Sequence, residues 1–263
     1  MPASHTTALI TGASSGIGAV TALSLAKAGY FVKLVARNEA GLTKLQASIE
    51  DSGGAAEFMP ADLTNEKDRI AVSQWISAEK TPIDVLINNA GLAWYGYAEE
   101  LPWHVAREML AVNMEAVVHL TSCCLPLMKS KRRGHIINIS SIAGSIPSQG
   151  VALYSATKAF VDAFSTAIYR ELVGTGVHMS VVRAGAVATP FFKSAADRQQ
   201  GKRVPAQRFA IQPEVVAQRI LNLIERPRRV IYVPRILRVV PLIELTMGWL
   251  MDRLGPLLLK RAV

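Results

Sequence analysis

Tyr154 and Lys158 have the residue types and the spacing for proton transfer. Residues four apart lie on the same side of a helix, so the phenol and the ammonium are expected to point together. An ammonium beside a phenol favours the phenolate and lowers a pKa that is about 10 without such a neighbour. A tyrosine tuned in this way is a useful acid or base near neutral pH. The alternative is a surface helix that carries the two residues by chance.

A buried strand over residues 135–139 is expected before this helix, because the run is rich in isoleucine and follows Gly134. It ends in Ser140 and Ser141, whose side chains point in opposite directions if the strand alternation continues. Tyr154 and Lys158 would then face the end of the strand that carries Ser141.

A glycine-rich turn follows the first expected strand, residues 7–11, and precedes a helix expected over 19–28. Glycine lets the backbone approach a phosphate closely, and the free N–H groups at the start of a helix bind the anion. The second strand, 30–36, is followed by Arg37, where NAD-preferring folds place an acidic residue. An arginine pairs with a 2′-phosphate, which favours NADP(H); the alternative is a solvated loop cation.

Strand and helix patterns alternate along the whole chain. Further strands are expected at 55–61, 83–87, 177–182 and 230–233, and further helices at 39–52, 65–79, 102–111, 113–130, 154–173 and 213–224. This order predicts an α/β fold, a Rossmann-like doubly wound parallel sheet of about seven strands with helices on both faces, in a single domain over residues 1–233. Ligands bind beyond the carboxyl ends of such strands. Residues 191–210 are expected to be irregular and to cover that edge.

The chain has a net charge of +9, and most of this positive charge lies near the C-terminus. Residues 201–263 hold 12 Lys/Arg and 4 Asp/Glu. Residues 234–263 are expected to be a basic amphipathic extension, packed on the domain, on an oligomer interface or on a membrane surface. Pro241 and Glu244 interrupt its apolar pattern and favour packing. Adjacent Cys123 and Cys124 predict neither a disulfide nor a metal site. We expect a cytoplasmic protein, with peripheral membrane association as the alternative and no nucleic-acid partner.

Together these motifs resemble the short-chain dehydrogenase/reductase family over residues 7–233. The resemblance is carried by Thr-Gly-x-x-x-Gly-x-Gly at Thr11–Gly18, Asn-Asn-Ala-Gly at Asn88–Gly91, Asn113, Ser141, Tyr154-x-x-x-Lys158 and a loop that ends at Thr189. One departure is Ala184-Gly185, where the family usually has Pro-Gly. Loss of the proline ring frees the backbone there, so this loop is expected to be less fixed.

The resemblance implies four catalytic residues. Tyr154 would exchange a proton with the carbonyl or alcohol oxygen and Ser141 would hydrogen-bond the same oxygen. Lys158 would lower the Tyr154 pKa and bind the nicotinamide ribose, and Asn113 would anchor a water. Cofactor contacts are expected from Gly12, Ser14, Ser15, Gly16, Ile17, Gly18, Arg37, Asp62, Leu63, Asn89, Ala90, Gly91, Tyr154, Lys158, Val187 and Thr189. Substrate contacts are expected from Ser141, Tyr154, Trp94, Tyr95 and Phe191.

The function implied is an NADP(H)-dependent oxidoreductase that interconverts a carbonyl and an alcohol on a small lipophilic substrate, such as a steroid, a retinoid or a fatty carbonyl. NADP(H) is the expected cofactor, with NAD(H) as the alternative. A homodimer or homotetramer is expected by analogy. Two other functions remain open, an NAD-linked alcohol dehydrogenase and a non-catalytic cofactor-binding sensor or scaffold.

Overall fold

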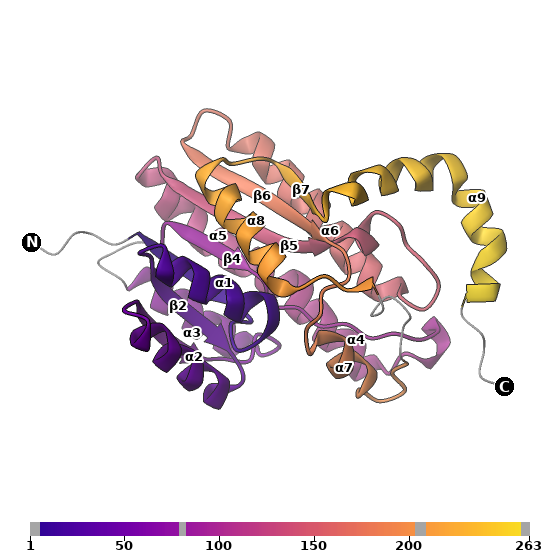
Figure 1. Ribbon diagram of the computed structural model, residues 1–263, viewed down its shortest axis with the longest axis horizontal. Coiled ribbons are helices and arrows are strands. Elements are labelled where there is room, and N and C mark those ends of the chain that lie inside the picture. The colour runs from indigo at the N-terminus through magenta and orange to yellow at the C-terminus, as the bar shows by residue number, and fades with distance from the viewer. Residues whose placement is uncertain (1–5, 79–82, 203–208, 259–263) are drawn as a thin grey trace, which may run out of the picture.

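The computed structural model describes residues 6–78, 83–202 and 209–258, and a seven-stranded parallel sheet forms its centre (Figure 1). The strands pair in the order β3-β2-β1-β4-β5-β6-β7, so the direction of winding reverses between β1 and β4. They are β1 (Thr7–Thr11), β2 (Phe31–Ala36), β3 (Ala55–Pro60), β4 (Val85–Asn88), β5 (Gly134–Ser141), β6 (Val177–Ala184) and β7 (Val230–Val233). The predicted doubly wound sheet is confirmed.

Helices cover both faces of the sheet. One face packs against α1 (Gly16–Lys27), α2 (Glu39–Asp51) and α8 (Pro213–Glu225), and the other against α3 (Glu66–Ser77), α5 (Ala116–Ser130) and α6 (Ala152–Glu171). Strand alternation divides the core in the same way, because Ile10 joins the first cluster and its neighbour Leu9 joins the second. The predicted helix 65–79 ends at Ser77, and its last position lies outside the described residues.

Two helices that the sequence analysis separated are continuous. A π-helical turn, η2 (Ala111–Glu115), joins α4 (Trp103–Leu110) to α5. By length and composition the combined helix Trp103–Ser130 is apolar enough to cross a membrane. In this fold its side chains Leu120, Cys124 and Met128 are instead buried against the sheet.

Residues 191–210 are less irregular than expected. A short helix, α7 (Phe191–Ala196), begins directly after Pro190, and Ile211 forms a parallel bridge with Val187. Proline stabilises a helix start, because its fixed φ suits the first turn and its missing N–H has no partner there in any case. Positions 203–208 of this segment lie outside the described residues.

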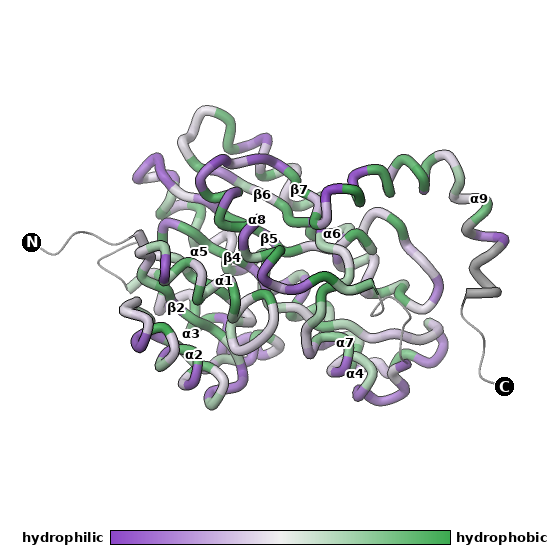
Figure 2. Tube along the Cα trace, in the orientation of Figure 1, coloured by the Kyte–Doolittle hydropathy of each residue, from purple (hydrophilic) through white to green (hydrophobic). Residues whose placement is uncertain are grey.

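The C-terminal extension folds as η5 (Arg235–Val239) and α9 (Val240–Leu258), and α9 extends away from β7 (Figure 1). Pro241 does not interrupt the helix, because it occupies the second position, where no intrahelical N–H bond is needed. Much of α9 consists of apolar residues (Figure 2), and several of their side chains are exposed. Leu242, Leu245 and Trp249 are 62%, 83% and 65% exposed.

Candidate active site

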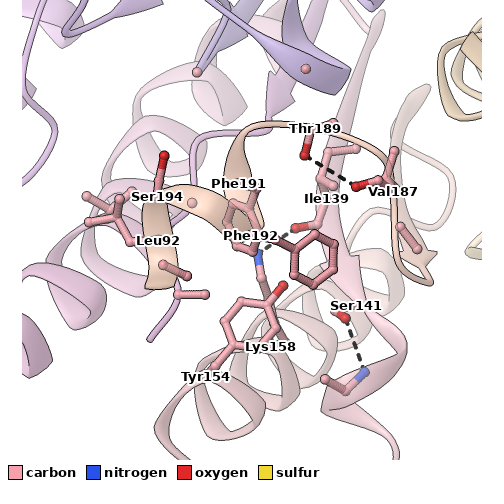
Figure 3. Close-up of a pocket in the computed structure, with 18 of the residues that line it drawn as sticks. Leu92, Ile139, Ser141, Tyr154, Lys158, Val187, Thr189, Phe191, Phe192 and Ser194 are labelled. Atoms are coloured by element: carbon pink, nitrogen blue, oxygen red, sulfur yellow. Dashed lines mark hydrogen bonds between the residues drawn. The ribbon is translucent and has the colours of Figure 1, made fainter. Parts of the chain in front are cut away.

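Tyr154, Lys158 and Ser141 line one cavity of about 990 Å³ at the carboxyl edge of the sheet. Figure 3 shows the first two rising from α6 beside the end of β5. Lys158 Nζ donates a hydrogen bond to the Ile139 carbonyl oxygen at 2.9 Å, which fixes its amine at the cavity floor. The Ser140 hydroxyl is bound to the Lys158 carbonyl at 3.2 Å. Ser141 Oγ accepts from the Ala143 N–H at 3.1 Å, which leaves its hydroxyl proton to donate to the Tyr154 oxygen or to a ligand.

Burial dominates the protonation of these groups. It raises the pKa of Tyr154 to about 12, and the Ser141 hydroxyl opposes that rise. It also lowers the pKa of Lys158 to about 8, and the Asp162 charge opposes that fall. The sequence-based expectation of a lowered Tyr154 pKa therefore does not hold in this structure, where Lys158 Nζ lies 5.8 Å from the centre of the phenol ring. A neutral phenol near pH 7 is a proton donor, as carbonyl reduction requires.

Asn113 lies in the π-helical turn and is completely buried. Its Nδ2 donates to the Leu92 carbonyl at 2.8 Å and to Thr157 Oγ1 at 3.0 Å, and its Oδ1 accepts from the Leu92 N–H at 2.8 Å. The side chain thus ties the loop after β4 to α6 and does not itself line the cavity. Its predicted role as a water anchor stays a prediction.

The glycine-rich turn forms a close-fitting cradle between β1 and α1. Gly12 has a φ of +65°, and a Cβ there would lie 2.8 Å from Ala90 Cα. A Cβ on Gly18 would collide with the Gly12 carbonyl oxygen. Asn89 fastens the turn, because its Nδ2 donates to the Thr11 and Gly12 carbonyl oxygens at 2.9 and 3.1 Å. Backbone rather than side chains therefore borders this part of the cavity, which fits a bound pyrophosphate.

The structure brings most of the predicted cofactor residues to the same cavity. Those that line it are Gly12, Ser14, Ser15, Gly16, Ile17, Arg37, Asp62, Leu63, Asn89, Ala90, Gly91, Tyr154, Lys158, Val187 and Thr189. Gly18 packs behind the turn. Arg37 Nη1 lies 3.8 Å from Asp62 Oδ2, and both side chains are well exposed at the far end of the cavity. This loose pair leaves guanidinium donors free for an anionic group.

Backbone hydrogen bonds hold the loop that begins at Ala184-Gly185 after β6. The Gly185 N–H donates to the Val233 carbonyl at 2.9 Å, and the Ala188 N–H donates to the Ile211 carbonyl at 2.8 Å. These backbone bonds hold the loop from both sides. The expectation that Ala184 makes this loop less fixed than a proline would stays a prediction.

Aromatic rings surround Tyr154 on its substrate side. The Tyr95 and Phe191 rings lie 6.3 and 5.9 Å from the Tyr154 ring between centroids, and Phe192 stacks on Tyr95 at 6.1 Å. Figure 3 shows Phe191 and Phe192 above Tyr154 in the cavity. Trp94 is instead buried outside the cavity lining, with its indole N–H donating to the Gln199 carbonyl at 3.0 Å. The alternation of an extended segment would have separated Trp94 from Tyr95 in this way.

Sequence reasoning missed several residues of this cavity. Phe192, Ser194 and Arg198 come from α7 and the segment after it, and Glu244 and Asp252 come from α9. The pair of adjacent phenylalanines was a usable signal for Phe192. No motif or spacing links α9 to the catalytic residues, so Glu244 and Asp252 could be assigned to the cavity only from the structure.

Residues 6–200 match the family described as short chain dehydrogenase. Together with the seven-stranded sheet and the Ser141, Tyr154 and Lys158 site, this match shows that the chain belongs to the short-chain dehydrogenase/reductase family. It is therefore an NAD(P)-dependent oxidoreductase by family.

Three similar proteins define its neighbourhood more closely. A ketoacyl reductase from Nostoc sp. is 38% identical over 69% of this chain, which spans 63% of that protein. A fatty acyl-CoA reductase from Acinetobacter baylyi is 36% identical over 85% of this chain and 74% of its own length. The structure of a short-chain dehydrogenase from Sphingobium yanoikuyae in complex with NADPH covers 98% of this chain and 97% of that chain, with 30% identity and a TM-score of 0.81. That alignment reaches into the C-terminal extension.

Proposed function

We propose that this chain is an NADP(H)-dependent reductase that converts a ketone or aldehyde group on a bulky lipophilic substrate to an alcohol. The grouping of Tyr154, Ser141 and Lys158 in an aromatic-walled cavity carries this proposal. Several relatives support the substrate class by name. They are the two reductases above, a very-long-chain 3-oxoacyl-CoA reductase from Laccaria bicolor and a bulky-bulky ketone specific alcohol dehydrogenase from Comamonas testosteroni.

The protein's own residues then perform the proton chemistry. A bound nicotinamide dinucleotide would supply the hydride, and the glycine-rich turn and Arg37 would hold its phosphates. Ser141 Oγ donates a hydrogen bond to the substrate carbonyl oxygen, and Tyr154 Oη gives its proton to that oxygen as negative charge develops there. Lys158 stabilises the resulting phenolate and binds the ribose. Tyr95 and Phe191 exclude water around this proton transfer.

The direct test is NADPH consumption by the purified protein with a series of aryl and long-chain alkyl ketones. We expect turnover with bulky ketones and little with acetone, because only a large apolar group fills the aromatic subsite. Turnover only with NAD⁺ and alcohols would replace this function by an oxidative one. Tight cofactor binding without any turnover would favour the alternative of a non-catalytic cofactor-binding sensor or scaffold.

Arg37 is expected to determine the preference for NADPH. A charge-assisted hydrogen bond contributes about 1.5–3 kcal/mol, so Arg37→Ala should raise the Kd for NADPH by about 10- to 100-fold. The Kd for NADH, which lacks the 2′-phosphate, should change little. Nicotinamide fluorescence titration measures both, and Arg107→Ala, an exposed cation on α4, is a matched control. Equal losses for the two cofactors would remove the 2′-phosphate role from Arg37.

The outward apolar face of α9 supports the expected homo-oligomer. We infer that a second subunit covers Leu242, Leu245 and Trp249, because exposed apolar patches on this scale mark interaction surfaces. Leu245→Asp is then expected to convert an oligomer to a smaller species in light scattering. A monomeric wild type that floats with anionic liposomes would assign the face to a membrane instead. The cytoplasmic setting stays a prediction.

A further inference from the structure

Helix α9 contributes two carboxylates to the wall of the active-site cavity. Glu244 and Asp252 line the same cavity as Tyr154, while Leu245 and Trp249 of this helix face outward. Two acidic side chains of α9, the half-buried Glu244 and the exposed Asp252, therefore border the cavity, while these apolar side chains face solvent. A helix packed only for stability has the opposite arrangement.

The Glu244 carboxylate has an unused hydrogen-bond acceptor. Its Oε2 is buried and has no hydrogen-bond partner within the described part of the chain. A buried polar atom without a partner is unfavourable, and native proteins rarely retain one. A donor group on a molecule bound in the cavity would satisfy this oxygen.

The charged residues that α9 contributes to the cavity lining are both acidic. Among the described lining residues the charged ones are Arg37, Asp62, Lys158, Arg198, Glu244 and Asp252. Arg198 Nη1 is paired with Glu108 Oε2 at 2.8 Å, and Arg37, which follows β2, lies 3.8 Å from Asp62, which follows β3. Lys158 is fixed at the floor by the Ile139 carbonyl. Glu244 and Asp252 are thus the charged groups that α9 places at the cavity, and neither forms a salt bridge within the described residues.

We propose that Glu244, supported by Asp252, selects substrates that carry a hydrogen-bond donor remote from the reacting carbonyl. An ammonium group suits this wall best and a hydroxyl group second. A carboxylate in the same place meets like charge in a partly desolvated site. This inference rests on the proposed reductase function and narrows its substrate class to neutral or cationic carbonyl compounds with such a donor.

The test uses three bulky ketones with the same skeleton that end in an ammonium, a hydroxyl or a carboxylate group. For the wild type, kcat/KM with NADPH is expected to be about 10- to 100-fold higher for the ammonium than for the carboxylate compound. Glu244→Gln should reduce this ratio about tenfold, since the amide keeps the shape and removes the charge. Asp252→Asn should reduce it less, and provides a second variant if the first folds poorly.

Glu214→Gln is the matched control, because Glu214 is an exposed carboxylate on α8 outside the cavity lining. It should leave the ratio unchanged. A wild-type ratio near one, or the same ratio in Glu244→Gln, would overturn the inference while turnover of all three ketones upheld the reductase function. If no ketone is turned over, calorimetry with the three product alcohols measures binding directly. Charge-selective binding that depends on Glu244, without turnover, would support the selection and refute the reductase.

Discussion

Replacing Tyr154 with phenylalanine is expected to lower kcat for ketone reduction by about 10²- to 10⁴-fold, the range that positioned acid–base groups supply. The substitution removes one oxygen from a ring that is 9% exposed and packed between Tyr95 and Phe191. The fold and the cofactor cradle should therefore persist. Steady-state kinetics gives kcat, and nicotinamide fluorescence reports NADPH binding, which should change only a few-fold.

Tyr95→Phe is the matched control for this prediction. Tyr95 is buried in the same aromatic cluster, and burial raises the pKa of its phenol above the ordinary value as well. It removes the same atom from a neighbouring ring, so general effects on packing should be similar. If Tyr95→Phe lowers kcat as much as Tyr154→Phe does, Tyr154 is not the proton donor.

Lys158→Met is expected to remove activity on the same scale and to change how stability depends on pH. Burial lowers the pKa of Lys158 from 10.5 to about 8. Between these two values the unfolded chain binds more protons than the folded one, so the free energy of unfolding rises with pH across that window. Below pH 8 the buried ammonium costs a few kcal/mol, about 1.4 for each unit by which the pKa is lowered. The variant has no such group.

Urea unfolding of both proteins across this pH window measures the effect. The stability of the wild type should rise relative to Lys158→Met, and near neutral pH the variant should be at least as stable although it is inactive. Lys44→Met, which removes an exposed lysine of α2, should follow the wild type. Parallel curves for wild type and Lys158→Met would show that Lys158 does not titrate in this range in the folded protein.

Local patterns were enough to predict the sheet and the centre of the site. The strands alternate with helices at spacings that allow only a few topologies, and the residues at their carboxyl ends converge as the fold requires. Tyr154 and Lys158 came from a four-residue spacing within α6 and the glycine-rich turn from its place between β1 and α1. Each of these motifs lies within a few consecutive residues, so it can be recognised from the sequence alone.

Three properties depended on tertiary packing. The Tyr154 pKa follows from the cost of burying a phenolate, which outweighs the hydrogen bond from the Ser141 hydroxyl and is visible only once Phe191 and Tyr95 surround the ring. The orientation of Trp94 depends on Gln199, more than a hundred residues away. Glu244 borders the cavity only because of where the chain leads α9 after β7, which no local pattern predicts.

The π-helical turn at Ala111–Glu115 changes the direction in which the side chains of the Trp103–Ser130 helix point before and after it. A π turn holds one residue more than an α turn, so the helix after it is rotated by about 100° relative to an unbroken one. Met109 before the turn packs in the aromatic cluster beside Tyr154, and Leu120 after it packs against the sheet. Deleting one residue from this turn would make the helix regular. One of these two faces would then be rotated away from the surface against which it now packs. A single-codon insertion would thus be enough to let one helix serve both the substrate wall and the core.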